Sequence, residues 1–144
     1  MSGKQIDDLL CFAIYSAGHA FNRVYKPLLD ELNLTYPQYL VMVALWAKDG
    51  QTVGELGQSL FLESSTLTPL LKRVEAQGYI ERRRDAKDER QVRVVLTAAG
   101  KKLAQSARGI PKCMLEASGL SADAAAKLQS EIARVRDRLL ASAE

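Results

Sequence analysis

The amino-acid sequence predicts a mainly helical protein with one small β-hairpin. Three observations in its 144 residues predict this fold. Two capped amphipathic helices follow each other after residue 52, a hairpin rich in arginine comes directly after them, and apolar residues at helical spacing lie on both sides. This order is that of a winged helix-turn-helix module. We expect a single domain over 1–144, in which residues 52–97 form the module and residues 1–34 and 98–144 form flanking helices.

Helix start and stop signals define both helices of the module. Thr52 and Glu55 have the spacing of a capping box, which predicts a first helix over residues 53–60. A second helix is expected over residues 64–77, followed by Gly78, because glycine readily adopts the left-handed conformation that ends helices. The short separation between the two is typical of a helix-turn-helix.

The second helix has one apolar and one polar face. The apolar residues that we expect to face the core are Leu67, Leu71 and Val74. The polar side chains that this arrangement turns outward are Ser65, Thr68 and Lys72. Side chains of this kind can reach base edges and phosphates in the major groove of duplex DNA, which is therefore the expected partner.

The hairpin that follows carries concentrated positive charge. Its strands are expected over residues 80–84 and 91–96, around the polar tip DAKDER, which we interpret as a wing. The basic residues in or beside the tip are Arg82, Arg83, Arg84, Lys87, Arg90 and Arg93. We place Arg90 in a minor groove, with its guanidinium oriented by a bidentate pair with Asp88. For the hairpin alone, charge that serves only solubility is an equally good explanation; beside two such helices, phosphate binding is favoured.

The flanks are predicted to be helical. An apolar stripe predicts a first helix from Ile6 to Tyr25, interrupted at Pro27. The next helix runs through Trp46, and its start signals are Thr35 as cap, Pro37 in the first turn and Gln38 completing a capping box. After the wing, Thr97 is expected to cap a helix from Ala98 to Leu115. This helix should bend near Gly109 and Pro111. Ser121 is expected to cap the last helix.

The last helix presents a narrow apolar seam on an otherwise charged, alanine-rich surface. The seam consists of Leu128, Ile132, Val135 and Leu139. A small domain has too little chain left to cover such stripes at both ends, so we expect a homodimer that pairs through the flanking helices. A two-fold axis would place two recognition helices ~34 Å apart, which suits a palindromic operator. The alternative is that the two ends pack on each other within one chain.

Composition agrees with a cytoplasmic globular protein. The hydrophobic content of 47% is sufficient for a core, and the net charge of +3 is too small to indicate nucleic acid by itself. The N-terminus does not have the pattern of a secretory signal, and no apolar run is long enough to span a membrane. Two cysteines in such a chain favour free or redox-active thiols over a permanent bridge. His19, the only histidine, has no second ligand at metal spacing, so we expect no metal.

Long strings of this sequence resemble a known family. The order of helices, wing and DERQ tip resembles the MarR family of dimeric winged-helix repressors, from Leu10 to the last helix. Within that family, three strings resemble the organic-hydroperoxide sensors of the OhrR branch: LCFAIY at 10–15, YKPLLDELNLTYPQYL at 25–40 and LTPLLKRVEAQGYI at 67–80.

The resemblance implies a function and the residues that perform it. It implies a repressor, not an enzyme, that binds operator DNA as a reduced homodimer and is released when organic hydroperoxide oxidises the thiolate of Cys11. It also implies that Tyr25 and Tyr36 hydrogen-bond this sulfur, and that Cys11 of one subunit forms a disulfide with Cys113 of the other. No cofactor is implied, because a thiolate itself attacks an O–O bond.

Other readings of the same residues remain open. A lone cysteine on an apolar helix face is usually a small buried hydrophobe, so Cys11 alone would not indicate chemistry. One alternative function is a thiol peroxidase that uses both cysteines, which would leave the wing unexplained. Another is a ligand-gated regulator of the MarR type that binds a phenolic compound and does not use Cys11.

Overall fold

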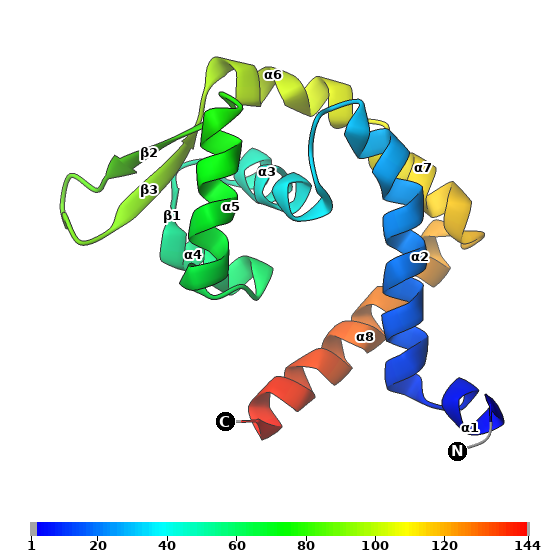
Figure 1. Ribbon diagram of the computed structural model, residues 1–144. Coiled ribbons are helices and arrows are strands. Elements are labelled where there is room, and N and C mark those ends of the chain that lie inside the picture. Colours follow the sequence, from blue (N-terminus) through cyan, green and yellow to red (C-terminus); the bar gives the residue numbers. More distant parts are fainter. Residues whose placement is uncertain (1–2, 144) are drawn as a thin grey trace. The chain divides into compact units, whose positions relative to one another are not determined.

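The computed structural model describes residues 3–143 and is mainly helical (Figure 1). The helices are α1 (Gly3–Asp7), α2 (Leu10–Asp30), α3 (Tyr36–Ala47), α4 (Val53–Leu60), α5 (Ser64–Ala76), α6 (Ala98–Ala107), α7 (Ile110–Ser118) and α8 (Ala122–Ser142). The strands are β1 (Gln51–Thr52), β2 (Ile80–Arg84) and β3 (Val92–Leu96). The chain forms two compact units, which meet in sequence between Arg108 and Gly109.

The first flanking helix differs from the prediction at both ends. The expected start at Ile6 falls in a separate short helix, because Asp7 ends α1 and the extended Leu9 precedes α2. Carboxylates at a helix C-terminus oppose the negative end of the helix dipole, which favours a break after Asp7. The expected interruption at Pro27 is wrong, since α2 continues to Asp30. Pro27 lies in the last turn, where it removes one amide donor.

Helix α3 begins as predicted. The hydroxyl of Thr35 accepts a hydrogen bond from the backbone N–H of Gln38 at 3.4 Å, and the side chain of Gln38 accepts one from the backbone N–H of Thr35 at 2.9 Å. These two bonds form the complete capping box, with Pro37 in the first turn. The capping box fixes the first turn of α3, a helix in which Met42 and Leu45 are completely buried.

The winged helix-turn-helix is confirmed, with one additional strand. Helix α4 has the predicted bounds, and the hydroxyl of Thr52 accepts a hydrogen bond from the N–H of Glu55 at 3.1 Å. Helix α5 ends one residue early, before Gly78 at φ +86°. Strand β3 begins one residue late and lies in the middle of an antiparallel sheet ordered β1-β3-β2. The two-residue strand β1 was not predicted, because such a short segment has no period.

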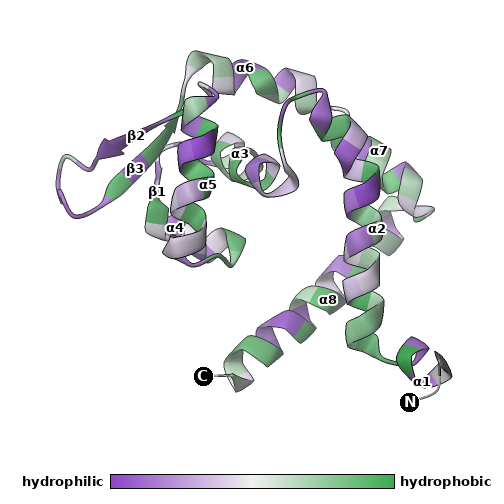
Figure 2. Cartoon of the chain, in the orientation of Figure 1, coloured by the Kyte–Doolittle hydropathy of each residue, from purple (hydrophilic) through white to green (hydrophobic). Residues whose placement is uncertain are grey.

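Packing of the first unit follows the predicted faces. Leu67, Leu71 and Val74 on α5 are fully buried. They belong to a core of the first unit whose other fully or nearly fully buried members include Leu29, Val41, Met42, Leu45, Leu56, Ile80 and Val94. Strand β2, in contrast, is largely hydrophilic (Figure 2). The buried side of α5 therefore fixes which of its side chains face outward.

The helix expected from Ala98 to Leu115 is instead two helices. Thr97 caps α6, accepting a hydrogen bond from the N–H of Gly100 at 3.0 Å, but the helix ends at Ala107. Helix α7 starts after Gly109 and continues to Ser118. The residues that predicted a bend cause a full break, since glycine disfavours helix and Pro111 has no amide donor.

Helix α8 starts at the predicted cap. The hydroxyl of Ser121 accepts a hydrogen bond from the N–H of Ala124 at 3.1 Å. Of the seam residues, Leu128, Ile132 and Leu139 are exposed and Val135 is half-buried. Among the described residues, no helix combines the length and the apolar character that crossing a membrane requires.

Candidate functional site

The polar face of α5 is placed largely as predicted. Ser65 and Lys72 are exposed, whereas Thr68 is half-buried. Thr68 lines a depression of about 350 Å³ that is bounded by the start of α4 and by the hairpin residues Arg90 and Val92. The first unit therefore brings the outward face of α5 and the hairpin to the same region.

The wing tip is organised by its own backbone. Arg84 donates a hydrogen bond from its guanidinium to the carbonyl of Glu89 at 2.7 Å. The carboxylate of Asp88 accepts one bond from Nε of Arg90 at 3.2 Å and one from its backbone N–H at 3.1 Å. Both bonds reach the same oxygen, so the bidentate pair expected between these two residues is not formed. The Arg90 side chain remains 93% exposed and available to a ligand.

Other arginines of the hairpin are engaged inside the protein. Arg82 pairs with Glu75 of α5 at 3.0 Å, and the Arg82 N–H and guanidinium together hold the pKa of that carboxyl below its usual value. Arg93 pairs with Asp85 at 2.6 Å. Sequence reasoning counted both arginines as charge facing a ligand and missed both carboxylates. The signal available was the position of Asp85 at the start of the tip, where aspartate commonly binds backbone amides.

Both cysteines are free and exposed in the described chain. Cys11 lies in the first turn of α2, after Leu9, which has no side-chain acceptor to cap the helix. The first amides of a helix lack internal partners and carry partial positive charge, so Cys11 lies beside unpaired backbone donors. Cys113 lies in α7, in the second unit. Nothing within the described part of one chain covers Cys11, so its surroundings depend on what packs against the start of α2.

Three tyrosines gather where the end of α2 meets the start of α3. The ring centroids of Tyr25 and Tyr36 lie 4.8 Å apart, and those of Tyr25 and Tyr39 lie 5.8 Å apart. Burial, together with Tyr36 and Tyr39, raises the pKa of Tyr25 to about 12, and burial also raises the pKa of Tyr36. Both phenols are therefore neutral at physiological pH and can donate hydrogen bonds. They line a depression of about 360 Å³ together with Leu29, Leu34 and Pro37.

The expected contact between Cys11 and these tyrosines is not made within one chain. Cys11 and Tyr25 lie on the same helix, fourteen residues apart. At 1.5 Å of rise per residue this separation is about 21 Å, far beyond a hydrogen bond. A contact between this thiol and the tyrosines therefore requires a second protomer.

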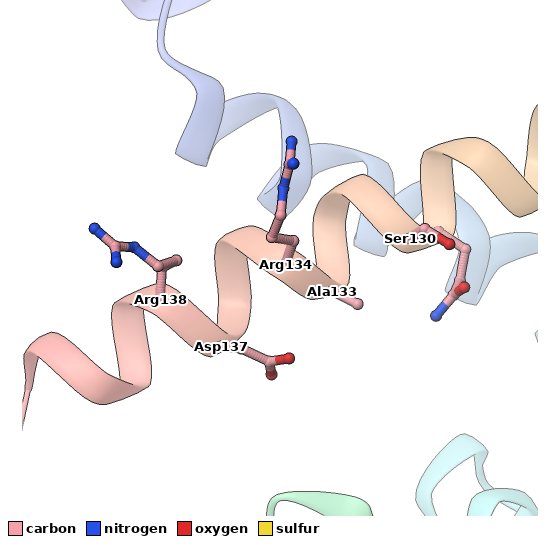
Figure 3. A pocket seen from close by; sticks show the side chains of 6 residues that line it. Ser130, Ala133, Arg134, Asp137 and Arg138 are labelled. Atoms are coloured by element: carbon pink, nitrogen blue, oxygen red, sulfur yellow. The ribbon is translucent and has the colours of Figure 1, made fainter.

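A further depression lies on α8. Its lining residues are Gln129, Ser130, Ala133, Arg134, Asp137 and Arg138. Figure 3 shows Arg134 and Arg138 pointing to the side of the helix opposite Asp137, so these charges do not converge on one point. Within the described residues, no group of three or more His, Cys, Asp or Glu side chains is placed to hold a metal.

Comparison with known proteins defines the class. The family of transcriptional regulators described as SarA/Rot matches residues 23–107. The chain is 46% identical to the HTH-type transcriptional regulator TtmR of Methylorubrum extorquens, covering 97% of this chain and 72% of the relative. It is 43% identical to the organic hydroperoxide resistance transcriptional regulator of Bacillus subtilis, over 89% and 87% of the two chains.

Solved structures of similar proteins indicate the same class. AbfR of Staphylococcus epidermidis is 32% identical and superposes with a TM-score of 0.80 over 95% of both chains. AbfR structures are also known in the reduced, DNA-bound state, with a TM-score of 0.79, and with a disulfide formed, with a TM-score of 0.67. The chain belongs to the MarR/SarA family of winged-helix transcriptional regulators, which confirms the resemblance and the prediction that it is not an enzyme.

Proposed function

We propose that this regulator is a homodimeric repressor that binds palindromic operator DNA when reduced and releases it when organic hydroperoxide oxidises Cys11. The observation that carries the proposal is a free thiol in the first turn of α2, in a chain whose α5 and wing present polar and basic side chains to one region. The 43% identical relative named for organic hydroperoxide resistance and the reduced, DNA-bound AbfR support it. A regulator of chromosomal genes would act in the cytoplasm.

The DNA interface would use both parts of the module at 52–97. Ser65, Thr68 and Lys72 would face the major groove, where hydroxyl and ammonium groups contact base edges and phosphates. Arg90 would enter the adjacent minor groove, and Asp88 would limit the directions of its guanidinium. Arg84, tied to the tip backbone, would add positive charge beside the phosphates.

Arg90→Ala should weaken operator binding and reduce the salt dependence of the binding constant by about one unit of log–log slope, because one phosphate-directed charge is lost. Affinity would be measured by fluorescence anisotropy at several salt concentrations. The probe is a duplex that the reduced parent selects from a random-sequence pool, here called the selected operator. Lys102→Ala, which removes an exposed charge on α6, should retain the parental slope. Parental affinity for Arg90→Ala at every salt concentration would show that the wing does not contact the operator.

Dimerisation would bury the exposed apolar faces of the flanking segments, residues 1–34 and 98–144. On α2, Leu10 is 63% and Phe21 is 48% exposed, and on α8 Leu139 is 64% exposed. Exposing apolar faces of this kind to water is unfavourable, and they are typical of helices that pair between chains. The separation of about 21 Å between Cys11 and Tyr25 independently requires a second protomer if the two are to cooperate.

The proposed sensor is thus shared between protomers. Sγ of Cys11, as a thiolate, attacks one peroxide oxygen; the O–O bond breaks, the alkoxide leaves and takes up a proton as an alcohol, and the sulfur becomes sulfenic acid. Tyr25 and Tyr36 of the second protomer would donate hydrogen bonds to the thiolate before the reaction. Their raised pKa values keep those donor protons in place.

Cys113 would complete the reaction as the resolving thiol. Its sulfur would attack the sulfenic sulfur of Cys11 in the other protomer, forming an S–S bond and releasing water. The resulting covalent bond would shift the two DNA-binding modules relative to each other and lower their joint affinity for a palindrome. A disulfide form of AbfR is known, which supports this class of switch.

Tyr36→Phe should leave operator binding unchanged but slow the oxidation of Cys11 by cumene hydroperoxide, because a hydrogen-bond donor to the charged sulfur is removed. Loss of free thiol over time measures the rate. Equal oxidation rates for the parent and Tyr36→Phe would show that the Tyr36 hydroxyl does not assist the reaction and that this side chain only packs.

A mixed dimer tests whether the sensor is shared. One protomer carries Cys11→Ser and the other Tyr36→Phe, so the remaining Cys11 faces an intact Tyr36 only across the dimer. Oxidation at the parental rate is expected. The slow rate of the Tyr36→Phe homodimer in this mixed dimer would contradict a shared sensor.

A second candidate function is regulation by a phenolic compound. The depression beside Tyr25 and Tyr36 has the size of a small-molecule site, at about 360 Å³. This function predicts that a phenolic acid releases Cys11→Ser from the selected operator as readily as the parent.

The experiment that tests the main proposal adds cumene hydroperoxide to the reduced parent bound to the selected operator. Loss of the complex, together with a covalent dimer on a non-reducing gel, is expected. Reductant should reverse both changes. A complex that persists while Cys11 is fully oxidised would contradict the proposal.

A further inference from the structure

Asp85 joins the two strands and the turn of the wing tip through both its side chain and its backbone. Its Oδ1 accepts a hydrogen bond from Nε of Arg93 at 2.6 Å, and its Oδ2 accepts one from the N–H of Asp88 at 3.1 Å. Its own N–H donates to the carbonyl of Gln91 at 2.9 Å. The carboxylate thereby closes the turn that carries Arg90. Its side chain is only 12% exposed, in contrast to the 93% exposed Arg90.

Arg93 connects this turn to the body of the module. It donates a second hydrogen bond, from its guanidinium to the carbonyl of Gly50 at 2.7 Å. Gly50 precedes β1, and Arg93 lies opposite Thr52, the cap of α4, in the sheet. The connection therefore runs from the wing tip through Arg93 to the segment that starts the helix-turn-helix.

We infer that Asp85 is a positioning residue for DNA binding: with Arg93 it holds the wing tip in the orientation that presents Arg90. The inference rests on the proposed DNA-binding function. Arg93, which the sequence suggested as a phosphate contact, uses its charge inside the module. The hydrogen bond from Arg93 also holds the pKa of the Asp85 carboxyl below its usual value, so the pair is ionised at physiological pH.

The sign of one mutational effect separates this role from simple electrostatics. DNA is a polyanion, so removing a carboxylate near the interface should strengthen binding if only charge matters. A positioning carboxylate has the opposite effect, because the turn loses its anchor although the protein gains positive charge. Glu89 provides a matched control. It is an exposed acid of the same tip, and the variant Glu89→Gln keeps the backbone carbonyl that Arg84 uses.

The test measures binding to the selected operator by the reduced full-length protein. Asp85→Asn should weaken binding about tenfold, the scale of one lost charge-assisted hydrogen bond. Glu89→Gln should strengthen it about twofold through its added charge. Parental or tighter binding by Asp85→Asn would overturn the inference. Failure of the parent itself to select and bind any duplex would instead refute the proposed function.

A second variant covers the case in which Asp85→Asn does not fold. Arg93→Lys keeps the charge and a bond to Asp85, but an ammonium cannot reproduce the two directed bonds of the guanidinium. It should weaken binding several-fold with the salt slope of the parent, because the charge is retained and only the directed bonds that hold the wing tip are lost. Parental affinity for Arg93→Lys would overturn the inference, because the wing tip would then bind the operator without the directed bonds of the guanidinium.

Discussion

Cys113→Ser should convert a reversible switch into an irreversible one. Cys11 would still react with peroxide, but its sulfenic acid would have no resolving thiol and would proceed to sulfinic and sulfonic acids. After cumene hydroperoxide, the variant should form no covalent dimer and should recover only a small fraction of its free thiol with reductant. Intact mass and non-reducing gels measure both outcomes.

Ala117→Ser is the matched control, since it places a hydroxyl on the exposed surface of the same helix and leaves Cys113 in place. It should form the covalent dimer and recover fully. If Cys113→Ser forms the same covalent dimer as the parent, Cys113 is not the resolving residue and the two-cysteine mechanism fails.

Gly100→Ala should destabilise the fold severely. A Cβ added at Gly100 would lie 2.1 Å from the carbonyl oxygen of Tyr79, a backbone atom that accepts the N–H of Thr97. The carbonyl of Gly100 also accepts the indole N–H of Trp46 at 2.9 Å. Because backbone is held on both sides, overpacking should reduce the free energy of unfolding by about 3 kcal/mol or more. Urea unfolding followed by Trp46 fluorescence measures the change.

Gly54→Ala is the control for this substitution. Gly54 is exposed in the first turn of α4, where an added Cβ meets only the Thr52 hydroxyl at an ordinary 3.8 Å. Alanine there should be neutral or stabilising by up to about 1 kcal/mol. A Gly100→Ala protein that unfolds at the same urea concentration as the parent would show that α6 can move away from Tyr79.

Local chemistry explains the parts of the fold that the sequence predicted. The caps at Thr35, Thr52, Thr97 and Ser121 bond within three residues, so the pattern contains its own partners. Leu67, Leu71 and Val74 follow one helical period and are buried together. Where the outcome depended on tertiary contacts the prediction failed, as at Pro27, where packing around Leu29 keeps the last turn of α2 helical.

The sequence predicted which types of residue form the candidate site, but not which residues their side chains pair with. Arg82 and Arg93 carry the charge expected of a DNA-binding wing, yet their carboxylate partners lie seven and eight residues away and are defined only by the hairpin and the helix beside it. The same limit applies to the sensor. Cys11 and Tyr25 both fall in the helix predicted from Ile6 to Tyr25, so their separation could be predicted, but a pattern in one chain does not contain the position of a second protomer.

Release of DNA by oxidation of Cys11 is the central claim, and one measurement tests it most directly. Reduced parent and Cys11→Ser are each bound to the selected operator and titrated with cumene hydroperoxide while anisotropy is followed. We predict that the parent dissociates and that Cys11→Ser, with equal initial affinity, remains bound at every peroxide concentration. Dissociation of Cys11→Ser at the same peroxide concentrations as the parent would contradict the account.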